Sequence, residues 1–199
     1  MRKILALSLC SLLLSGCSMF QSKPEPAPQP TISWQEHFNQ VNALDDWRAS
    51  GKVSITLDKR VQSAKLVWQQ QEDKFHIAFI GPLGQSGPVL KGDEGSASLT
   101  IPKEPEIKGP NTSSLLQQRL GWQLPVESAR FWIKGIPSPL SESEILLEQE
   151  KLSSLKQDGW DITYDRYLRS GDVELPAKIT LTRPELKLKF AIYNWELTP

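Results

Sequence analysis

The sequence has few of the residues on which several common functions depend. It contains only two cysteines and two histidines, too few for a disulfide scaffold or a zinc cluster. Its 23 basic and 23 acidic residues leave no net charge, whereas a nucleic-acid binder needs a basic surface to displace counterions from phosphate. No apolar run reaches the ~20 residues that span a bilayer. The chain is therefore neither a nucleic-acid binder nor a polytopic membrane protein.

What the N-terminus does contain is the pattern of a bacterial lipoprotein signal. A basic start precedes an apolar stretch from Ile4 to Leu14, which is too short to span a membrane. The motif Leu-Ser-Gly-Cys follows and ends at Cys17. It matches the lipobox, where a peptidase cleaves before a cysteine whose thiolate has been alkylated by a diacylglycerol. We expect residues 1–16 to be removed as a signal peptide and Cys17 to carry the lipid.

Residues 17–32 are predicted to form a tether between this lipid and a folded domain. Alternating prolines from Pro24 to Pro30 disfavour helix and sheet and favour an extended chain. At ~3.1 Å per residue, fifteen residues reach roughly 45 Å. Ser18 stands where an Asp would resemble an inner-membrane retention signal, so we expect the outer membrane. Residues 33–199 then form one domain on its periplasmic face.

A helix is predicted at the beginning of that domain. Ser33 and Glu36 form a capping box, which is typical of a helix N-terminus. The apolar residues at helical spacing are Trp34, Phe38, Val41 and Leu44. His37 neighbours this face, and we expect it to be capped or exposed to solvent rather than to act as a ligand.

Most of the remaining chain alternates apolar and polar residues, which predicts strands. The segments with this pattern are 47–58, 63–69, 74–80, 97–101, 145–147, 153–157, 160–165, 179–181 and 186–192. Two helices interrupt them, at 111–120 with Thr112 or Ser113 as the cap, and at 126–134. Short strands joined by hairpins predict a mainly β domain whose antiparallel sheet curls, with helices across its mouth.

Catalytic chemistry is poorly supported. The nearest candidate for a nucleophile is Ser86, with His37 or His76 as its base. Pro88 stands where the nucleophile elbow requires glycine, and we place the segment between two strands rather than between a strand and a helix. The sequence also lacks a phosphate-binding glycine loop. We therefore expect no enzyme, no metal and no cofactor.

Bulky apolar side chains are abundant instead, and we single out five as candidates for lining a cavity: Trp68, Phe75, Phe79, Trp132 and Trp160. Each of them could equally fill a solid core. Leu83 is a second unusual feature because it lies at the tip of the turn Gly81-Pro82-Leu83-Gly84, where polar residues are expected.

These segments together resemble the LolB family of outer-membrane lipoprotein receptors. The matching segments are Trp34-Gln35-Glu36-His37, Trp47 to Val53, Trp68-Gln69-Gln70, Gly81-Pro82-Leu83-Gly84, Gly121 to Val126, Trp132 to Pro137, Gln157-Asp158-Gly159-Trp160, Leu175-Pro176 and Ile192 to Trp195. The resemblance implies an open antiparallel β-barrel with a helical lid over a hydrophobic cavity.

The same resemblance implies a function. A LolB-like protein accepts acylated lipoproteins from the periplasmic carrier LolA and inserts them into the outer membrane. Leu83 matches the family leucine that serves membrane insertion, and Trp68 and Trp132 match family aromatics expected in the cavity. Gln85, Ser86 and Gly87 are more polar than the family loop. We expect a monomer whose partners are LolA, lipoprotein cargo and outer-membrane lipid.

Two other hypotheses remain open. The chain could be a structural outer-membrane lipoprotein with a solid core that acts as a docking piece in envelope assembly. The chain could also be an esterase, in which case Ser86→Ala would have to abolish turnover.

Overall fold

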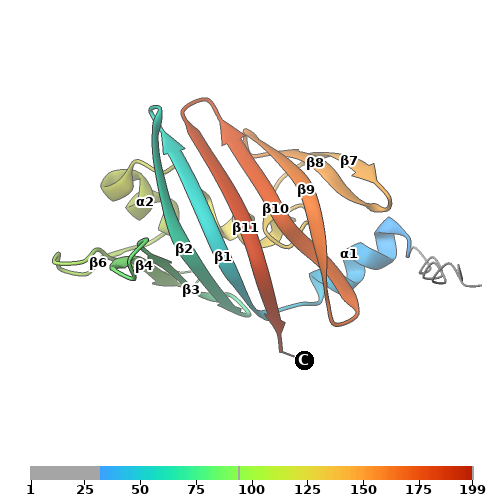
Figure 1. Cartoon of the computed structure of the whole chain (residues 1–199), viewed down its shortest axis with the longest axis horizontal. Coiled ribbons are helices and arrows are strands. Elements are labelled where there is room, and N and C mark those ends of the chain that lie inside the picture. Colours follow the sequence, from blue (N-terminus) through green and yellow to red (C-terminus); the bar gives the residue numbers. More distant parts are fainter. Residues whose placement is uncertain (1–31, 94, 199) are drawn as a thin grey trace, which may run out of the picture. The chain divides into compact units, whose positions relative to one another are not determined.

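A computed structural model describes residues 32–93 and 95–198 and contains one sheet of eleven strands. The strands are β1 (Asp46–Leu57), β2 (Arg60–Gln71), β3 (Lys74–Ile80), β4 (Ser86–Gly92), β5 (Ala97–Thr100), β6 (Ile107–Gly109), β7 (Ser143–Glu148), β8 (Lys151–Gln157), β9 (Trp160–Ser170), β10 (Val173–Arg183) and β11 (Leu186–Leu197). Their order in the sheet is β6-β5-β4-β3-β2-β1-β11-β10-β9-β8-β7 (Figure 1).

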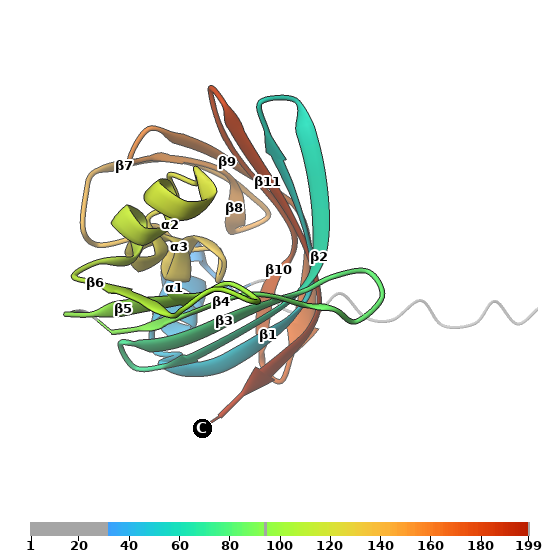
Figure 2. The same cartoon turned by 90° about the vertical axis from the view of Figure 1, so that its left-hand side faces the viewer.

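Every pair of neighbouring strands is antiparallel, and the sheet curls without closing. The order begins at β6 and ends at β7, so these two strands are free edges. Figure 2 shows α1 (Trp34–Asn42), α2 (Thr112–Leu120) and α3 (Val126–Trp132) on the concave side of the curl. The predicted fold, an open antiparallel barrel with helices over its hollow side, is confirmed.

The alternation of β1 explains how the concave face is built. Trp47, Ala49, Val53 and Ile55 are buried, and the side chains between them face outward. The register with β11 shifts between Ser50 and Gly51, and a side chain at Gly51 would lie 2.1 Å from the carbonyl oxygen of Ala191. β1 and β11 can therefore approach each other this closely at the register shift only because Gly51 has no Cβ.

β4 and β6 are the two strands that the apolar pattern did not predict. The segment Gly84 to Pro88 begins between β3 and β4, as expected, and no helix follows it directly, but Ser86, Gly87 and Pro88 already belong to β4. Pro88 stands within β4 beside a register shift against β3. A strand tolerates the missing N–H of proline at such an irregularity, but the proline and Gly87 hide the alternation in the sequence.

The helix caps agree with the sequence in one case and differ in another. Ser33 accepts a hydrogen bond from the backbone N–H of Glu36, as the capping box predicts. The cap of α2 is Asn111, not Thr112 or Ser113, because the Asn111 side chain accepts from Ser114 N at 2.8 Å. Thr112 is fully buried. α3 ends at Trp132, two residues earlier than predicted.

His37 holds α1 against the sheet, which corrects the expectation that it is capped or solvated. Its side chain is only 2% exposed. It contacts the ring of Tyr167 in β9 edge-on, with ring centroids 6.3 Å apart. Burial lowers the pKa of His37, Lys151 lowers it further, and Glu174 raises it in part. The folded protein therefore favours the neutral imidazole.

This burial predicts a pH dependence of stability. The pKa of His37 is lower in the folded chain than the 6.5 of a free histidine, so the unfolded chain binds the proton first as the pH falls. The contribution of neutral, buried His37 to the free energy of unfolding is fully present above pH 6.5. It decreases as the pH falls towards the pKa of His37 in the folded chain. We expect the free energy of unfolding, measured in urea, to decrease from pH 7 to pH 5.

His37→Gln should remove most of this decrease. His76→Gln is the matched control: burial and Lys91 lower the pKa of His76 as well, but this side chain is only half-buried. An unchanged pH slope in His37→Gln would contradict the assignment.

Candidate functional site

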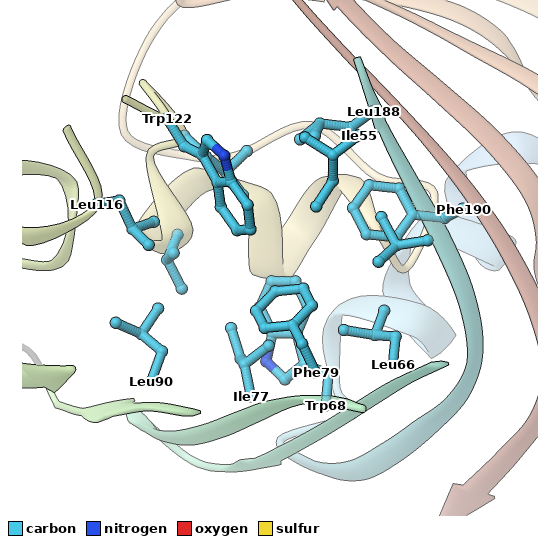
Figure 3. A pocket seen from close by; sticks show the side chains of 13 residues that line it. Ile55, Leu66, Trp68, Ile77, Phe79, Leu90, Leu116, Trp122, Leu188 and Phe190 are labelled. Atoms are coloured by element: carbon cyan, nitrogen blue, oxygen red, sulfur yellow. The ribbon is translucent and has the colours of Figure 1, made fainter. Parts of the chain in front are cut away.

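An apolar cavity lies between the concave face of the sheet and the segment from α2 to α3 (Figure 3). All thirteen residues that line it are aliphatic or aromatic, and they are Val53, Ile55, Leu66, Trp68, Ile77, Phe79, Leu90, Leu116, Trp122, Leu124, Val126, Leu188 and Phe190. Nine of them come from β1, β2, β3, β4 and β11. No polar side chain is available there to orient a polar substrate, so the wall suits a hydrocarbon ligand.

The cavity is almost completely filled by the side chains that line it. The space that water-sized molecules can occupy is about 20 Å³, room for one or two waters. Phe79 of β3 and Trp122, which follows α2, pack edge-to-face across it with ring centroids 5.5 Å apart. Both of these rings are only partly buried. An acyl chain can therefore enter only if side chains at this contact move apart.

The five aromatic candidates from the sequence separate into two groups. Trp68 and Phe79 line the cavity, whereas Phe75, Trp132 and Trp160 lie elsewhere in the core. Phe75 is at the far end of β3 from Phe79.

Trp132 and Trp160 support the fold beside α3. Their ring centroids are 6.2 Å apart. Trp132 Nε1 donates to Gln157 Oε1 at 2.7 Å, and Gln157 in turn accepts from the backbone N–H of Ser138 and donates to its carbonyl. This buried network fixes the chain that follows α3.

Four cavity residues come from the helical segment: Leu116, Trp122, Leu124 and Val126. The sequence analysis did not assign them to the cavity. The sequence shows that Leu116, Trp122 and Val126 are apolar, but not that they face the sheet. Gly121 ends α2 in the left-handed conformation, with φ 72°. This sharp end turns the chain so that Trp122 and Leu124 point inward. The glycine was visible as a helix stop, but the direction of the turn depends on tertiary packing.

The β3–β4 loop presents Leu83 to solvent. Leu83 is 87% exposed, more than any other large apolar side chain among the described residues. Gly84 N donates to Gly81 O at 3.0 Å, and Gly84 has a φ of 80°, which favours glycine. Figure 2 shows this loop beyond the outer face of the sheet, away from the helices.

Gln85 explains why this loop can be polar and still expose a leucine. Its side-chain oxygen accepts from Leu83 N at 3.1 Å, and its backbone carbonyl accepts from Gly81 N at 2.8 Å. Two hydrogen bonds thus fix the turn from inside. The polar side chain of Gln85 therefore stabilises the position of Leu83.

The residues considered for catalysis do not come together. Ser86 pairs with Ile80 in the β3–β4 register, four residues along β3 from His76, or roughly 13 Å. His37 is a buried residue of α1 whose ring contacts Tyr167 of β9. Among the described residues, no group of three His, Cys, Asp or Glu could hold a metal ion. Within residues 32–93 and 95–198, no helix has the length and apolar character needed to cross a membrane.

Comparison with known proteins identifies the family. The family model described as "Outer membrane lipoprotein LolB" matches residues 45–195. The chain belongs to the LolB family. LolB proteins from Pseudomonas syringae pv. syringae and from Stutzerimonas stutzeri are both 34% identical to it, over 98% and 94% of this chain and 96% and 91% of their own lengths.

These LolB relatives are named outer-membrane lipoproteins. LolB is thus the name of a lipoprotein family and not of an enzyme family. Cys17 and all but the last residue of the predicted tether lie outside the described residues.

Two solved structures share the fold. A LolA superfamily protein from Nitrosomonas europaea aligns with a TM-score of 0.55 at 10% identity, over 84% of this chain and 94% of that protein. A DUF1329 family protein from Desulfovibrio piger gives a TM-score of 0.54 at 10% identity, with 82% and 90% coverage. At this identity the similarity concerns the fold alone.

The Phe79–Trp122 contact generates a prediction for this LolB-family protein. Trp122→Ala removes the ring that closes the cavity, so an apolar naphthylamine dye should bind roughly tenfold more tightly, the effect of about 1.4 kcal/mol. Fluorescence titration measures this. Trp34→Ala is the matched control, because Trp34 is a partly buried tryptophan outside the cavity. Equal dye affinity in both variants would show that Trp122 does not close the cavity.

Proposed function

We propose that this protein is an outer-membrane receptor that accepts acylated lipoproteins from the soluble carrier LolA and inserts them into the outer membrane. The observation that carries the proposal is the cavity wall, which is built from apolar side chains alone on a fold shared with the LolA superfamily. Membership in the LolB family supports the same role. No catalytic residue is required, since the cargo is moved and not chemically changed.

The energetics explain why such a receptor needs a cavity. Burial of one CH₂ group is worth ~0.8 kcal/mol, so an exposed chain of about sixteen carbons costs on the order of 10 kcal/mol in water. A lipoprotein therefore has to pass from one apolar site to the next. Each step needs only a higher affinity at the next site, and ~1.4 kcal/mol gives a tenfold bias.

Loading of an acyl chain requires the closed cavity to widen, and the segment between α2 and α3 is the part best suited to move. Its tip is exposed at Gly121 and Gln123. Besides the Phe79–Trp122 ring contact, two side-chain hydrogen bonds hold it: Ser113 Oγ donates to Leu124 O at 3.3 Å, and Arg183 Nη1 donates to Gln123 O at 3.3 Å. We infer that this segment opens when cargo enters.

The anchor completes the proposed arrangement. Residues 1–16 are the signal peptide, residues 17–32 carry the lipid on Cys17 and form the tether, and residues 33–199 are the receptor domain. The tether would keep this domain, as a monomer, at the periplasmic face of the outer membrane. Leu83 would then contact the bilayer, where burial of its side chain is worth about 1.5–3 kcal/mol.

The small free volume of the cavity favours one competing function. A core that is almost filled by its own side chains is what a structural lipoprotein would have, and this protein would then act as a docking piece in the envelope. Such a protein would accept no acyl chain from a carrier.

Leu83→Glu tests the insertion step. The full-length variant, incorporated in liposomes, should still take labelled lipoprotein from the loaded carrier but fail to pass it to the bilayer, because a carboxylate resists burial in hydrocarbon. We expect membrane insertion to fall about tenfold or more, since at least 1.5 kcal/mol is lost. Pull-down measures acceptance, and protease-resistant insertion of the label measures release.

Val61→Glu is the matched control, because Val61 is another exposed apolar residue, 65% exposed, on β2. Normal insertion by Leu83→Glu would disprove the role of Leu83. Failure of the wild-type protein to accept any cargo would disprove the receptor function and favour the structural lipoprotein.

A further inference from the structure

Basic side chains gather on the outer, convex face of the sheet. The strand register places one row of residues across β3, β2, β1, β11, β10 and β9, and these are Ile80, Lys65, Lys52, Ala191, Lys178 and Arg166. Residues directly opposite each other in antiparallel strands point to the same face. Lys52 stands between the buried Gly51 and Val53, so this face is the outer one. All four basic side chains of the row are exposed.

Lys189 adds a fifth positive charge in the next row. It stands opposite Ser54 of β1 and Thr180 of β10, and it is exposed as well. We call Lys52, Lys65, Lys178, Lys189 and Arg166 the basic patch.

Two pairs in the row place like charges directly opposite each other. Lys52 stands opposite Lys65, and Lys178 stands opposite Arg166. The Cβ atoms of such pairs are only about 4.5–5.5 Å apart, so like charges there destabilise the sheet. None of these four side chains forms an ion pair among the described residues. An anionic partner would relieve this repulsion.

The neighbouring positions on this face provide no carboxylate to offset the Lys52–Lys65 pair. The adjacent rows consist of Ser63, Ser54, Lys189, Thr180 and Thr163 on one side, and of Ala78, Val67, Ser50 and Asn194 on the other. Asp165 precedes Arg166 in β9, where the register shift leaves it without a partner residue in β10. The uncompensated charge is therefore centred on Lys52 and Lys65.

The row ends at the loop that carries Leu83. Lys65 stands opposite Ile80, which is the last residue of β3, and the β3–β4 loop begins at the next position. Lys65 and Lys52 are one and two strands away from Ile80, or roughly 5 and 10 Å. Figure 2 shows the loop extending beyond the outer face of the sheet. A surface that receives the exposed Leu83 therefore also meets these two lysines.

We propose that the basic patch binds the anionic phospholipid head groups of the bilayer that Leu83 enters. Such a bilayer offers hydrocarbon for the leucine and negatively charged phosphate for the lysines at one surface. An acidic protein surface would match the lysines alone. The inference rests on the proposed contact of Leu83 with the bilayer, and it names the class of lipid that favours this contact.

The patch would give the receptor a defined orientation. An N-terminal lipid keeps a protein near a bilayer but does not select which face meets it. Each Lys or Arg close to an anionic surface strengthens the attraction roughly fivefold. This attraction decreases within a Debye length, which is ~8 Å at physiological salt. It therefore acts only when the outer face, and with it Leu83, is turned towards the lipid.

A fluorescent probe at position 83 of the full-length protein tests the proposal. With Cys17 acylated as proposed, Leu83→Cys supplies the free thiol of the mature chain, and a nitrobenzoxadiazole label on it becomes brighter in hydrocarbon. The protein is reconstituted in phosphatidylcholine vesicles, with or without added phosphatidylglycerol. We expect the ratio of lipid-buried to exposed probe to rise with phosphatidylglycerol and to decrease at high salt, which screens exposed charges.

The double variant Lys52→Gln with Lys65→Gln should lower this ratio roughly twentyfold in the anionic vesicles, because two positive charges are removed. The variant also removes a repulsion, so its free energy of unfolding in urea should not decrease, which separates lost binding from lost folding. Lys103→Gln with Lys108→Gln is the matched control. It removes two exposed lysines at β6 and the segment before it, at the edge of the sheet.

Equal ratios in neutral and anionic vesicles would overturn the proposal. An unaffected Lys52/Lys65 double variant would do the same and would favour an acidic protein as the partner of the patch. Cargo acceptance is measured separately, with Leu83 intact, and this double variant should take labelled lipoprotein from the loaded carrier normally. If the wild type accepts no cargo while the probe still responds to phosphatidylglycerol, the receptor function fails and the lipid-binding face is supported.

Discussion

The rest of the structure depends on one constraint: an open, curled sheet has an apolar concave face that must be covered. A closed barrel would fill its own interior, but here β6 and β7 remain apart, so helices have to cover the hollow side (Figure 2). Helices that only lie across a sheet do not share its backbone hydrogen bonds. The contact between them is made by side chains such as Phe79 and Trp122, and it can separate without breaking a strand pairing.

In this arrangement, different parts of the molecule have different roles. The strands that form the cavity wall are joined by backbone pairing along the sheet, whereas the segment from Gly121 to Pro125 is held by few hydrogen bonds. Leu83 is on a turn fixed by Gln85, on the opposite side of the sheet from the helices. Cargo binding and contact with a bilayer would therefore use separate surfaces, which lets each act without blocking the other.

Most of the fold could be predicted from the sequence, because apolar and polar residues alternate along most of the strands. The strand from Trp47 to Leu57 and the capping box at Ser33 are local patterns, and both were predicted correctly. β4 was not, because Pro88 interrupts its alternation at a register shift. The burial of His37 depends on Tyr167, which is 130 positions away in the chain. The near closure of the cavity likewise depends on how side chains from distant segments fill space, which periodicity cannot show.

The central claim is that an acyl chain enters the apolar cavity. Of the seven tryptophans, Trp68 and Trp122 line that cavity. The most direct measurement is the tryptophan fluorescence of the full-length protein after it receives a lipoprotein with brominated acyl chains, because bromine quenches only indoles in contact with it. The account predicts quenching that falls markedly in Trp122→Phe and not in Trp34→Phe. No quenching, or equal quenching in both variants, would contradict it.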